Sequence, residues 1–174
     1  KGHGPLLDEL KLDKILDFNE EEFSKNLVPV YDAIKKVKKE VSDKSVIGFV
    51  GAPWTLLLYM LNRQSPKKNF IFSEINKNQE IINKLLPLLE KAICIHIKGQ
   101  VDAGANIIQI FDSWAGLLPI SELNKFCFEP TSKIANYVKS LKIPTICFPR
   151  GIKKNYLNFC NIIKPDCLSI DYEI

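Results

Sequence analysis

The chain has 174 residues, 46% of them hydrophobic and 25% charged, and its formal net charge is +4 at pH 7. This length suits one domain with a sizeable core, and the composition excludes a disordered chain. The lysines alternate with acidic residues, which predicts a solvated surface and no nucleic-acid partner. The apolar runs fall short of the roughly 20 residues that span a membrane, and the first residues do not resemble a signal peptide, so we expect no membrane attachment.

The five cysteines are scattered, odd in number and without a CxxC pair. They are Cys94, Cys127, Cys147, Cys160 and Cys167. This usage predicts reduced thiols in the cytoplasm and disfavours a structural zinc site.

The first part of the chain contains a long helical pattern and one strand. Apolar side chains recur at helical spacing over residues 20–40, and Asn19 followed by Glu22 is typical of a capping box. The apolar run at residues 46–50 predicts a buried strand. Residues 56–61 are expected to form a short helix.

The middle of the chain begins with a polar loop over residues 63–69. A long helix is then predicted over residues 78–103. Pro87 should bend this helix, and Gly104 should end it.

Strand and helix patterns continue to alternate in the last part of the chain. Strands are predicted at residues 106–111, 144–148 and 166–171. Helices are predicted at residues 121–141, with an interruption near Pro130, and at 153–163.

This alternation predicts parallel βαβ units with right-handed crossovers. The choice lies between an open doubly wound sheet and a (β/α)8 barrel, and no GxGxxG follows a strand to support the dinucleotide-binding version of the former. A full barrel takes about 250 residues, so four strands predict about half of one. The pattern alone does not name a reaction.

In parallel α/β folds, ligands bind at the loops that follow the strands. Here these loops are residues 51–55, 112–116, 149–151 and 171–172. Thr55 is expected to cap a helix that begins at Leu56, and the free amide groups of such a helix start favour a carboxylate. Tyr59, one turn into this helix, could reach back over the strand ends.

Four segments carry a resemblance to a known family. They are GFVGAPWTLLLY (48–59), GANIIQIFDSWAG (104–116), FPRG (148–151) and SIDY (169–172). In order and spacing they resemble the uroporphyrinogen decarboxylase family over essentially the whole chain, most specifically where GAPWT is combined with Gly48, Phe49 and Tyr59. The chain departs from the family pattern at Asn62-Arg63, where a small or acidic residue followed by glycine or lysine is usual.

The resemblance implies a (β/α)8 barrel that forms a homodimer in the cytoplasm. It also implies an enzyme of porphyrin (heme and chlorophyll) biosynthesis, a carboxy-lyase. Such an enzyme removes the four acetate carboxyl groups of uroporphyrinogen III as carbon dioxide and yields coproporphyrinogen III. The family uses no metal and no organic cofactor.

The resemblance also assigns site residues. Tyr59 and Ser113 match substrate contacts of the family, and Phe49 matches a residue that lines its cleft. The family's arginine-rich segment and catalytic aspartate would lie before Lys1, and its substrate-contacting histidine after Ile174. We therefore expect residues 1–174 to be a single incomplete barrel domain, an internal piece that holds no catalytic residue and is inactive alone.

Other polar and aromatic residues near the strand ends have structural interpretations. Strand alternation puts Asp112 on the face opposite Ser113, which favours a cap or loop hydrogen bond over acid catalysis. Trp54 and Trp114 are interpreted as packing beneath the loops. His96 is interpreted as a helix-packing residue.

Arg150 could pair with a substrate propionate or with a surface acid, and Asp171 receives no role.

Two alternatives stay open. A corrinoid or coenzyme M methyltransferase on the same barrel would use zinc held by a His-x-Cys pair, but the corresponding strand reads Thr145-Ile146-Cys147. A non-catalytic barrel relative is the second alternative.

Overall fold

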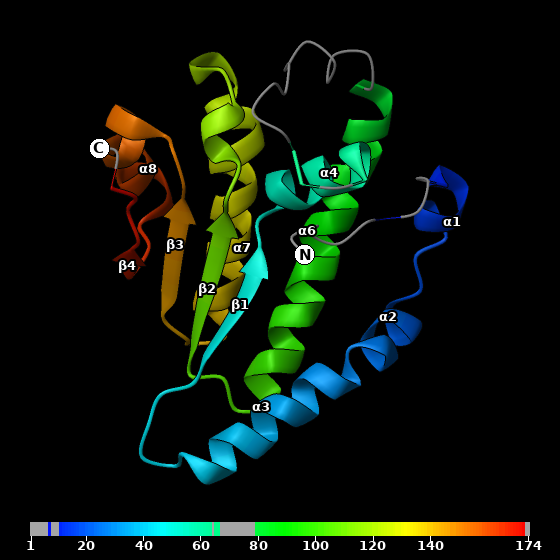
Figure 1. Cartoon of the computed structure of the whole chain (residues 1–174), viewed down its shortest axis with the longest axis vertical. Helices are drawn as coiled ribbons and strands as arrows, with labels where there is room; N and C mark the ends of the chain where they lie inside the picture. The colour runs from blue at the N-terminus through cyan, green and yellow to red at the C-terminus, as the bar shows by residue number, and fades with distance from the viewer. Residues whose placement is uncertain (1–6, 8–10, 64, 67–78, 173–174) are drawn as a thin grey trace, which may run out of the picture.

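A computed structural model describes residues 7, 11–63, 65–66 and 79–172. Four strands form one parallel sheet in the order β1-β2-β3-β4 (Figure 1). They are β1 (Ile47–Gly51), β2 (Ile107–Asp112), β3 (Thr145–Pro149) and β4 (Cys167–Leu168). The predicted parallel βαβ arrangement is therefore confirmed.

Helices connect these strands. The α-helices are α1 (Leu12–Leu16), α2 (Glu20–Asn26), α3 (Val28–Glu40), α4 (Pro53–Asn62), α6 (Gln79–Asp102), α7 (Glu129–Ser140) and α8 (Tyr156–Ile163). The shorter turns are the 3-10 helices η1 (Ala115–Leu117), η2 (Ile120–Glu122) and η4 (Lys153–Asn155), and the π-helix η3 (Asn124–Phe128).

The helix predicted over residues 20–40 is wrong in one respect, because the structure has two helices that meet at Leu27. Pro29 lies in the first turn of α3, where its missing N–H costs nothing, but it could not continue a helix arriving from α2. The predicted cap is confirmed, since the Glu22 amide donates to Asn19 Oδ1 at 3.0 Å.

The prediction that Thr55 caps a helix beginning at Leu56 is also wrong. Helix α4 begins at Pro53 and has Ala52 at its N-cap, because the fixed backbone angle of proline suits a first helical turn. At the other end of α4, Arg63 has a φ of 60°, a left-handed conformation that ends the helix.

Later elements follow the predictions with small changes. Pro87 lies inside α6 without ending it, and Gly104 ends the turn after α6 with a φ of 110°. Pro130 lies in the first turn of α7, where the π-helix η3 passes into α7, so the change near it is one of helix type and the backbone stays helical. Strand β4 has only two residues, fewer than predicted over 166–171. Residues 64 and 67–69 of the predicted loop, and residue 78, lie outside the described residues.

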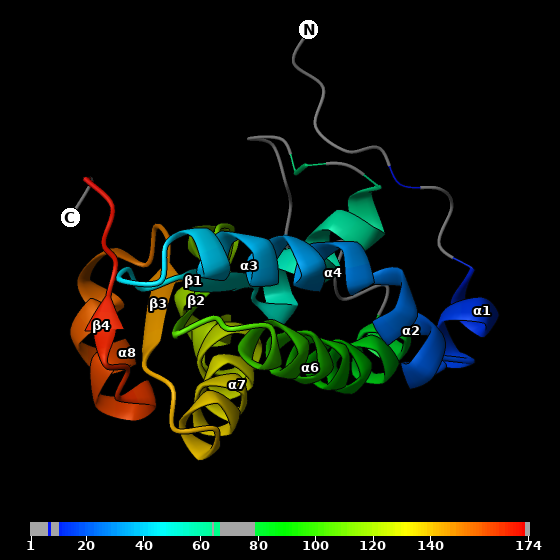
Figure 2. The same cartoon turned by 90° about the horizontal axis from the view of Figure 1, so that it is seen from below.

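The sheet has one face covered by helices. Figures 1 and 2 show α6, α7 and α8 together on this side. Alternate strand residues point into the core there, among them Val50, Ile108, Ile110 and Cys147, all 4% exposed or less. On the opposite face Ile47 is 48% exposed and Phe49 is 63% exposed. The described part of the chain therefore completes one face of its sheet and leaves the other accessible.

Helix α3 packs against α6 through a tyrosine and a glycine. The ring of Tyr31 occupies the space in front of Gly99, where any larger side chain would collide with it. The Tyr31 hydroxyl lies 3.2 Å from His96 Nδ1, and burial lowers the pKa of this histidine. The helix-packing interpretation of His96 is confirmed.

All five cysteines are free thiols in the structure, as predicted. No helix within the described residues combines the length and apolar character that a membrane crossing demands.

Candidate functional site

The loops after β1, β2 and β3 are joined by backbone hydrogen bonds at one edge of the sheet. The Ala52 amide donates to the Phe111 carbonyl at 2.8 Å, and the Arg150 amide donates to the Asp112 carbonyl at 3.1 Å. The Gly116 amide in turn donates to the Arg150 carbonyl at 2.8 Å. The loops that the sequence singled out thus form one continuous rim.

A set of side-chain hydrogen bonds, which we call the Thr55 clasp, ties the start of α4 to the turn after β2. The Thr55 hydroxyl donates to Asp112 Oδ1 at 2.7 Å, and the Trp114 amide donates to Thr55 Oγ1 at 3.3 Å. Trp54 adds a third bond from its indole N–H to the Trp114 carbonyl at 3.0 Å. These contacts confirm the loop hydrogen bond expected of Asp112 and the packing role of Trp54, which is fully buried.

Asp112 is a buried carboxyl group with little stabilisation of its charge. It is 2% exposed, and its Oδ2 has no hydrogen-bond partner of ordinary geometry. Burial raises its pKa to about 6, although Thr55 and the neighbouring Cys127 thiol oppose the rise. Because Asp112 points into the helix-covered face, it is shielded from a ligand at the rim.

The two predicted substrate contacts lie on the two segments that the clasp joins. Tyr59 is half-buried on α4, four residues after Thr55, and therefore on the same face of the helix. Ser113 is half-buried and stands directly between Asp112 and Trp114. Figure 1 shows α4 at the end of the sheet to which the strands point. Substrate contact by either hydroxyl remains a prediction.

The predicted cleft residue Phe49 belongs to a row of aromatic rings on the open face. In register, Gly51 of β1 lies beside Phe111, which lies beside Phe148 of β3. The ring centroids of Phe49 and Phe111, and of Phe111 and Phe148, are each 6.1 Å apart in edge-to-face geometry. This row is an apolar surface that suits the flat ring system of a large ligand or further core side chains.

Asp171 organises the end of the rim, a role that the sequence did not reveal. Its Oδ2 accepts hydrogen bonds from the Gly151 amide at 2.5 Å and from the Tyr156 hydroxyl at 3.0 Å. Gly151 has a φ of 81° and touches Gly116 so closely that a Cβ on Gly116 would lie 2.9 Å from the Gly151 Cα. The only hint of this structural role in the sequence was the position of Asp171 after a predicted strand. Arg150, by contrast, is exposed.

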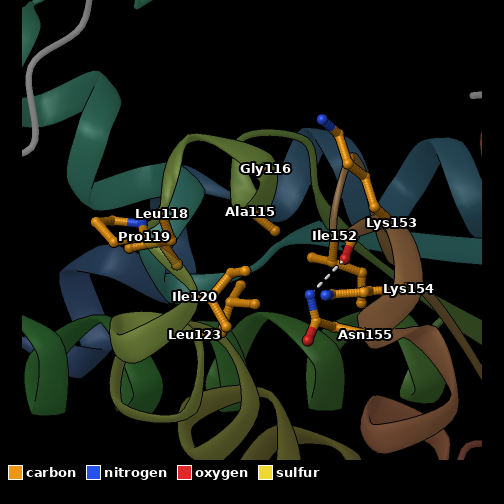
Figure 3. Close-up of a pocket in the computed structure, with 11 residues that line it drawn as sticks. Ala115, Gly116, Leu118, Pro119, Ile120, Leu123, Ile152, Lys153, Lys154 and Asn155 are labelled. Carbon is orange, nitrogen blue, oxygen red and sulfur yellow. Dashed lines mark hydrogen bonds between the residues drawn. The ribbon is translucent and has the colours of Figure 1, made fainter.

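A cavity of about 500 Å³ lies between the loops after β2 and β3. It is lined by residues from 115–123 and 151–155 (Figure 3). Lys154 extends into the space between the loops, whereas Lys153 points away from it. Phe49, Tyr59 and Ser113 do not line this cavity, so the predicted contacts belong to a different part of the rim.

Within the described ranges, no cluster of three or more histidine, cysteine or acidic residues could hold a metal ion. Cys147, on the strand where a zinc-dependent relative would carry its thiolate, is 1% exposed on the helix-covered face. Burial raises its pKa to about 12, so it is a neutral core thiol.

Comparison with known proteins shows that this chain belongs to a known family. The family model described as uroporphyrinogen decarboxylase (URO-D) matches residues 2–174. A uroporphyrinogen decarboxylase of Rickettsia bellii is 39% identical over 97% of this chain and 51% of its own length. That of Orientia tsutsugamushi is 38% identical over 94% of this chain and 49% of its own length. The chain thus spans about half the length of the curated relatives it matches.

A solved structure, a methyltransferase from Methanosarcina mazei, superposes with a TM-score of 0.57 at 21% identity. It covers 85% of this chain, which in turn covers 42% of that structure, and at this identity the likeness concerns the fold alone. The four parallel strands are an incomplete part of a (β/α)8 barrel, as predicted.

Proposed function

Because this chain belongs to the uroporphyrinogen decarboxylase family, we propose that the complete protein removes the four acetate carboxyl groups of uroporphyrinogen III. The products are coproporphyrinogen III and carbon dioxide, and the reaction belongs to porphyrin biosynthesis. The family match over residues 2–174 is the observation that carries this proposal. The rim geometry supports it, since both motifs that bear the family's contact residues meet there.

The chemistry needs little from the protein beyond binding, orientation and a proton donor. Protonation of a pyrrole carbon creates a cation that accepts the electrons of the departing carboxylate, so the substrate is its own electron sink. Tyr59 and Ser113 would donate hydrogen bonds to substrate carboxylates, and Phe49 would line the cleft beside the rings. The proton donor and the cationic binding segment are proposed to come from the half of the barrel outside this chain.

We also propose the remaining properties that the resemblance implies. Residues 1–174 form one incomplete barrel domain of a cytoplasmic homodimer that needs no cofactor. The accessible face of the sheet supports an incomplete barrel. In a closed barrel this face would line the packed interior, whereas Phe49 on it is exposed here.

The methyltransferase alternative is not favoured. It needs a thiolate with a histidine two positions earlier, but Thr145 holds that position and Cys147 is buried. Stoichiometric zinc in the complete protein would support that alternative.

The test is an assay of uroporphyrinogen III decarboxylation by the complete protein. Carbon dioxide release and the tetrapyrrole products are measured. Tyr59→Phe and Ser113→Ala should each lower kcat/KM about 10- to 100-fold, because a hydrogen bond to a charged group contributes roughly 1.5–3 kcal/mol. Tyr137→Phe and Ser45→Ala make the same chemical changes away from the rim and should leave kcat/KM unchanged. Carbon dioxide release by the isolated 174-residue chain would contradict its expected inactivity.

A further inference from the structure

The Thr55 clasp holds both flanks of Ser113. Asp112, on one side of the serine, accepts the hydrogen bond from the Thr55 hydroxyl, and Trp114, on the other side, donates its amide to Thr55 Oγ1. The carbonyl of Trp114 is fixed by the indole of Trp54. The turn that presents Ser113 therefore has little freedom to move relative to the first turn of α4.

The same helix carries Tyr59 one turn further on. Residues i and i+4 of a helix lie one above the other, so the clasp at Thr55 also fixes the rotation and height of Tyr59 relative to the sheet. The hydrogen bond between Thr55 and Asp112 is thus one of three clasp bonds that link the positions of the two predicted contact residues.

Stability does not explain this polar pair. Thr55 is 5% exposed and Asp112 is 2% exposed, and the second carboxyl oxygen has no hydrogen-bond partner of ordinary geometry. Burying a carboxyl group in this way is costly, and an apolar pair of the same shape is often as stable or more so. A hydrogen bond differs from apolar packing in that it sets distance and direction.

We propose that Thr55 and Asp112 are positioning residues, whose hydrogen bond sets the spacing between Tyr59 and Ser113 for substrate binding and decarboxylation. Asp112 does not touch the substrate, because it lies on the helix-covered face of the sheet. This inference rests on the proposed function for its kinetic test, although the link between the two segments is measurable without it.

The decisive experiment replaces both partners at once in the complete protein. Thr55→Val with Asp112→Leu removes the Thr55–Asp112 hydrogen bond, and with it the bond from the Trp114 amide, while keeping the shapes and leaving no unpaired carboxyl group. We expect the double variant to keep the parent's melting temperature and to lose about 10- to 100-fold in kcat/KM, since small misplacements of reacting groups have effects of this size. The parent's kcat/KM in a folded double variant would overturn the proposal, and so would a double variant that does not fold.

Single variants separate position from mere hydroxyl loss. Thr55→Ser keeps the hydroxyl, and its kcat/KM should stay within about threefold of the parent's because the hydrogen bond to Asp112 is retained. Thr131→Val is the matched control, since Thr131 is 2% exposed and its hydroxyl has no hydrogen-bond partner. It should change neither melting temperature nor kcat/KM, and a loss equal to that of Thr55→Val would overturn the proposal.

Hydrogen exchange distinguishes failure of this inference from failure of the proposed function. In Thr55→Val the Trp114 amide loses its acceptor, and its exchange should be at least about tenfold faster than in the parent. If the parent has no decarboxylase activity but this acceleration is found, the proposed function fails and the positional link stands. Unchanged exchange of Trp114 would overturn the link itself.

Discussion

The two faces of this sheet differ in how their side chains find partners. On the helix-covered face, Ile108 and Ile110 are fully buried, and polar groups such as Asp112 have specific hydrogen bonds. On the open face, Ile47 is 48% exposed and Phe49 is 63% exposed. More buried and more exposed residues alternate along each of these strands.

The difference shows that the described part of the chain covers one face of its sheet and leaves the other face accessible. The edge-to-face row of Phe49, Phe111 and Phe148 is packed within the open face but not covered from above. Large exposed apolar surfaces are unusual in monomeric soluble proteins. The remaining strands of a barrel would enclose this row.

The largest expected effect comes from removing core side chains on the two faces. Ile110→Ala in the complete protein should lower the free energy of unfolding by about 2–5 kcal/mol, because a buried cavity is left. Ile47→Ala is its matched partner on the open face and should cost a similar amount if the rest of the barrel covers it. Urea unfolding of both variants measures this.

A loss below about 1 kcal/mol for Ile47→Ala would show that the open face remains a solvent surface in the complete protein, in conflict with a closed barrel.

The next effect concerns the carboxyl group of Asp112, which is buried on the helix-covered face at the end of β2. The pKa of Asp112 is raised from 3.8 to about 6, so the folded state holds its proton more tightly than the unfolded state does. The stability contributed by this group is therefore present below about pH 4 and lost as the pH rises through 6, by about 3 kcal/mol. Asp112→Asn does not titrate, so its stability relative to the parent should rise by this amount between pH 4 and pH 7.

Urea unfolding of Asp112→Asn and the parent across this pH range tests the expectation. A constant difference between them would mean that the carboxyl group is solvated in the complete protein.

The smallest effect is expected where the rim joins the loops after β2 and β3. Gly116→Ala would place a methyl group about 3 Å from the Gly151 backbone, which has to move. Such overpacking costs about 1–3 kcal/mol, which thermal unfolding will detect. Ser121→Ala, at an exposed position of the same connection, should be neutral within about 0.5 kcal/mol.

Local patterns predicted most of the elements, because hydrophobic periodicity and capping act over a few residues. The strand run before Gly51 and the cap at Asn19 were visible in this way. The break between α2 and α3 was missed because the helical pattern continues through Leu27 and conceals the effect of Pro29.

The candidate site was predictable only in part. Motifs placed Tyr59 and Ser113 after strands, and alternation separated Ser113 from Asp112. Asp112 lies 57 residues from Thr55 in the sequence, and Gly151 and Tyr156 lie 20 and 15 residues from Asp171, so no local pattern could reveal these pairs.

By itself, the sequence determined the parallel α/β rhythm, the family and the edge of the sheet where its motifs meet, since these depend on periodicity and short-range spacing. Only the tertiary structure decided that Thr55 binds Asp112 instead of capping its helix and that Asp171 holds Gly151. Each of these depends on which distant groups compete for the same donor, acceptor or apolar surface once the chain is folded.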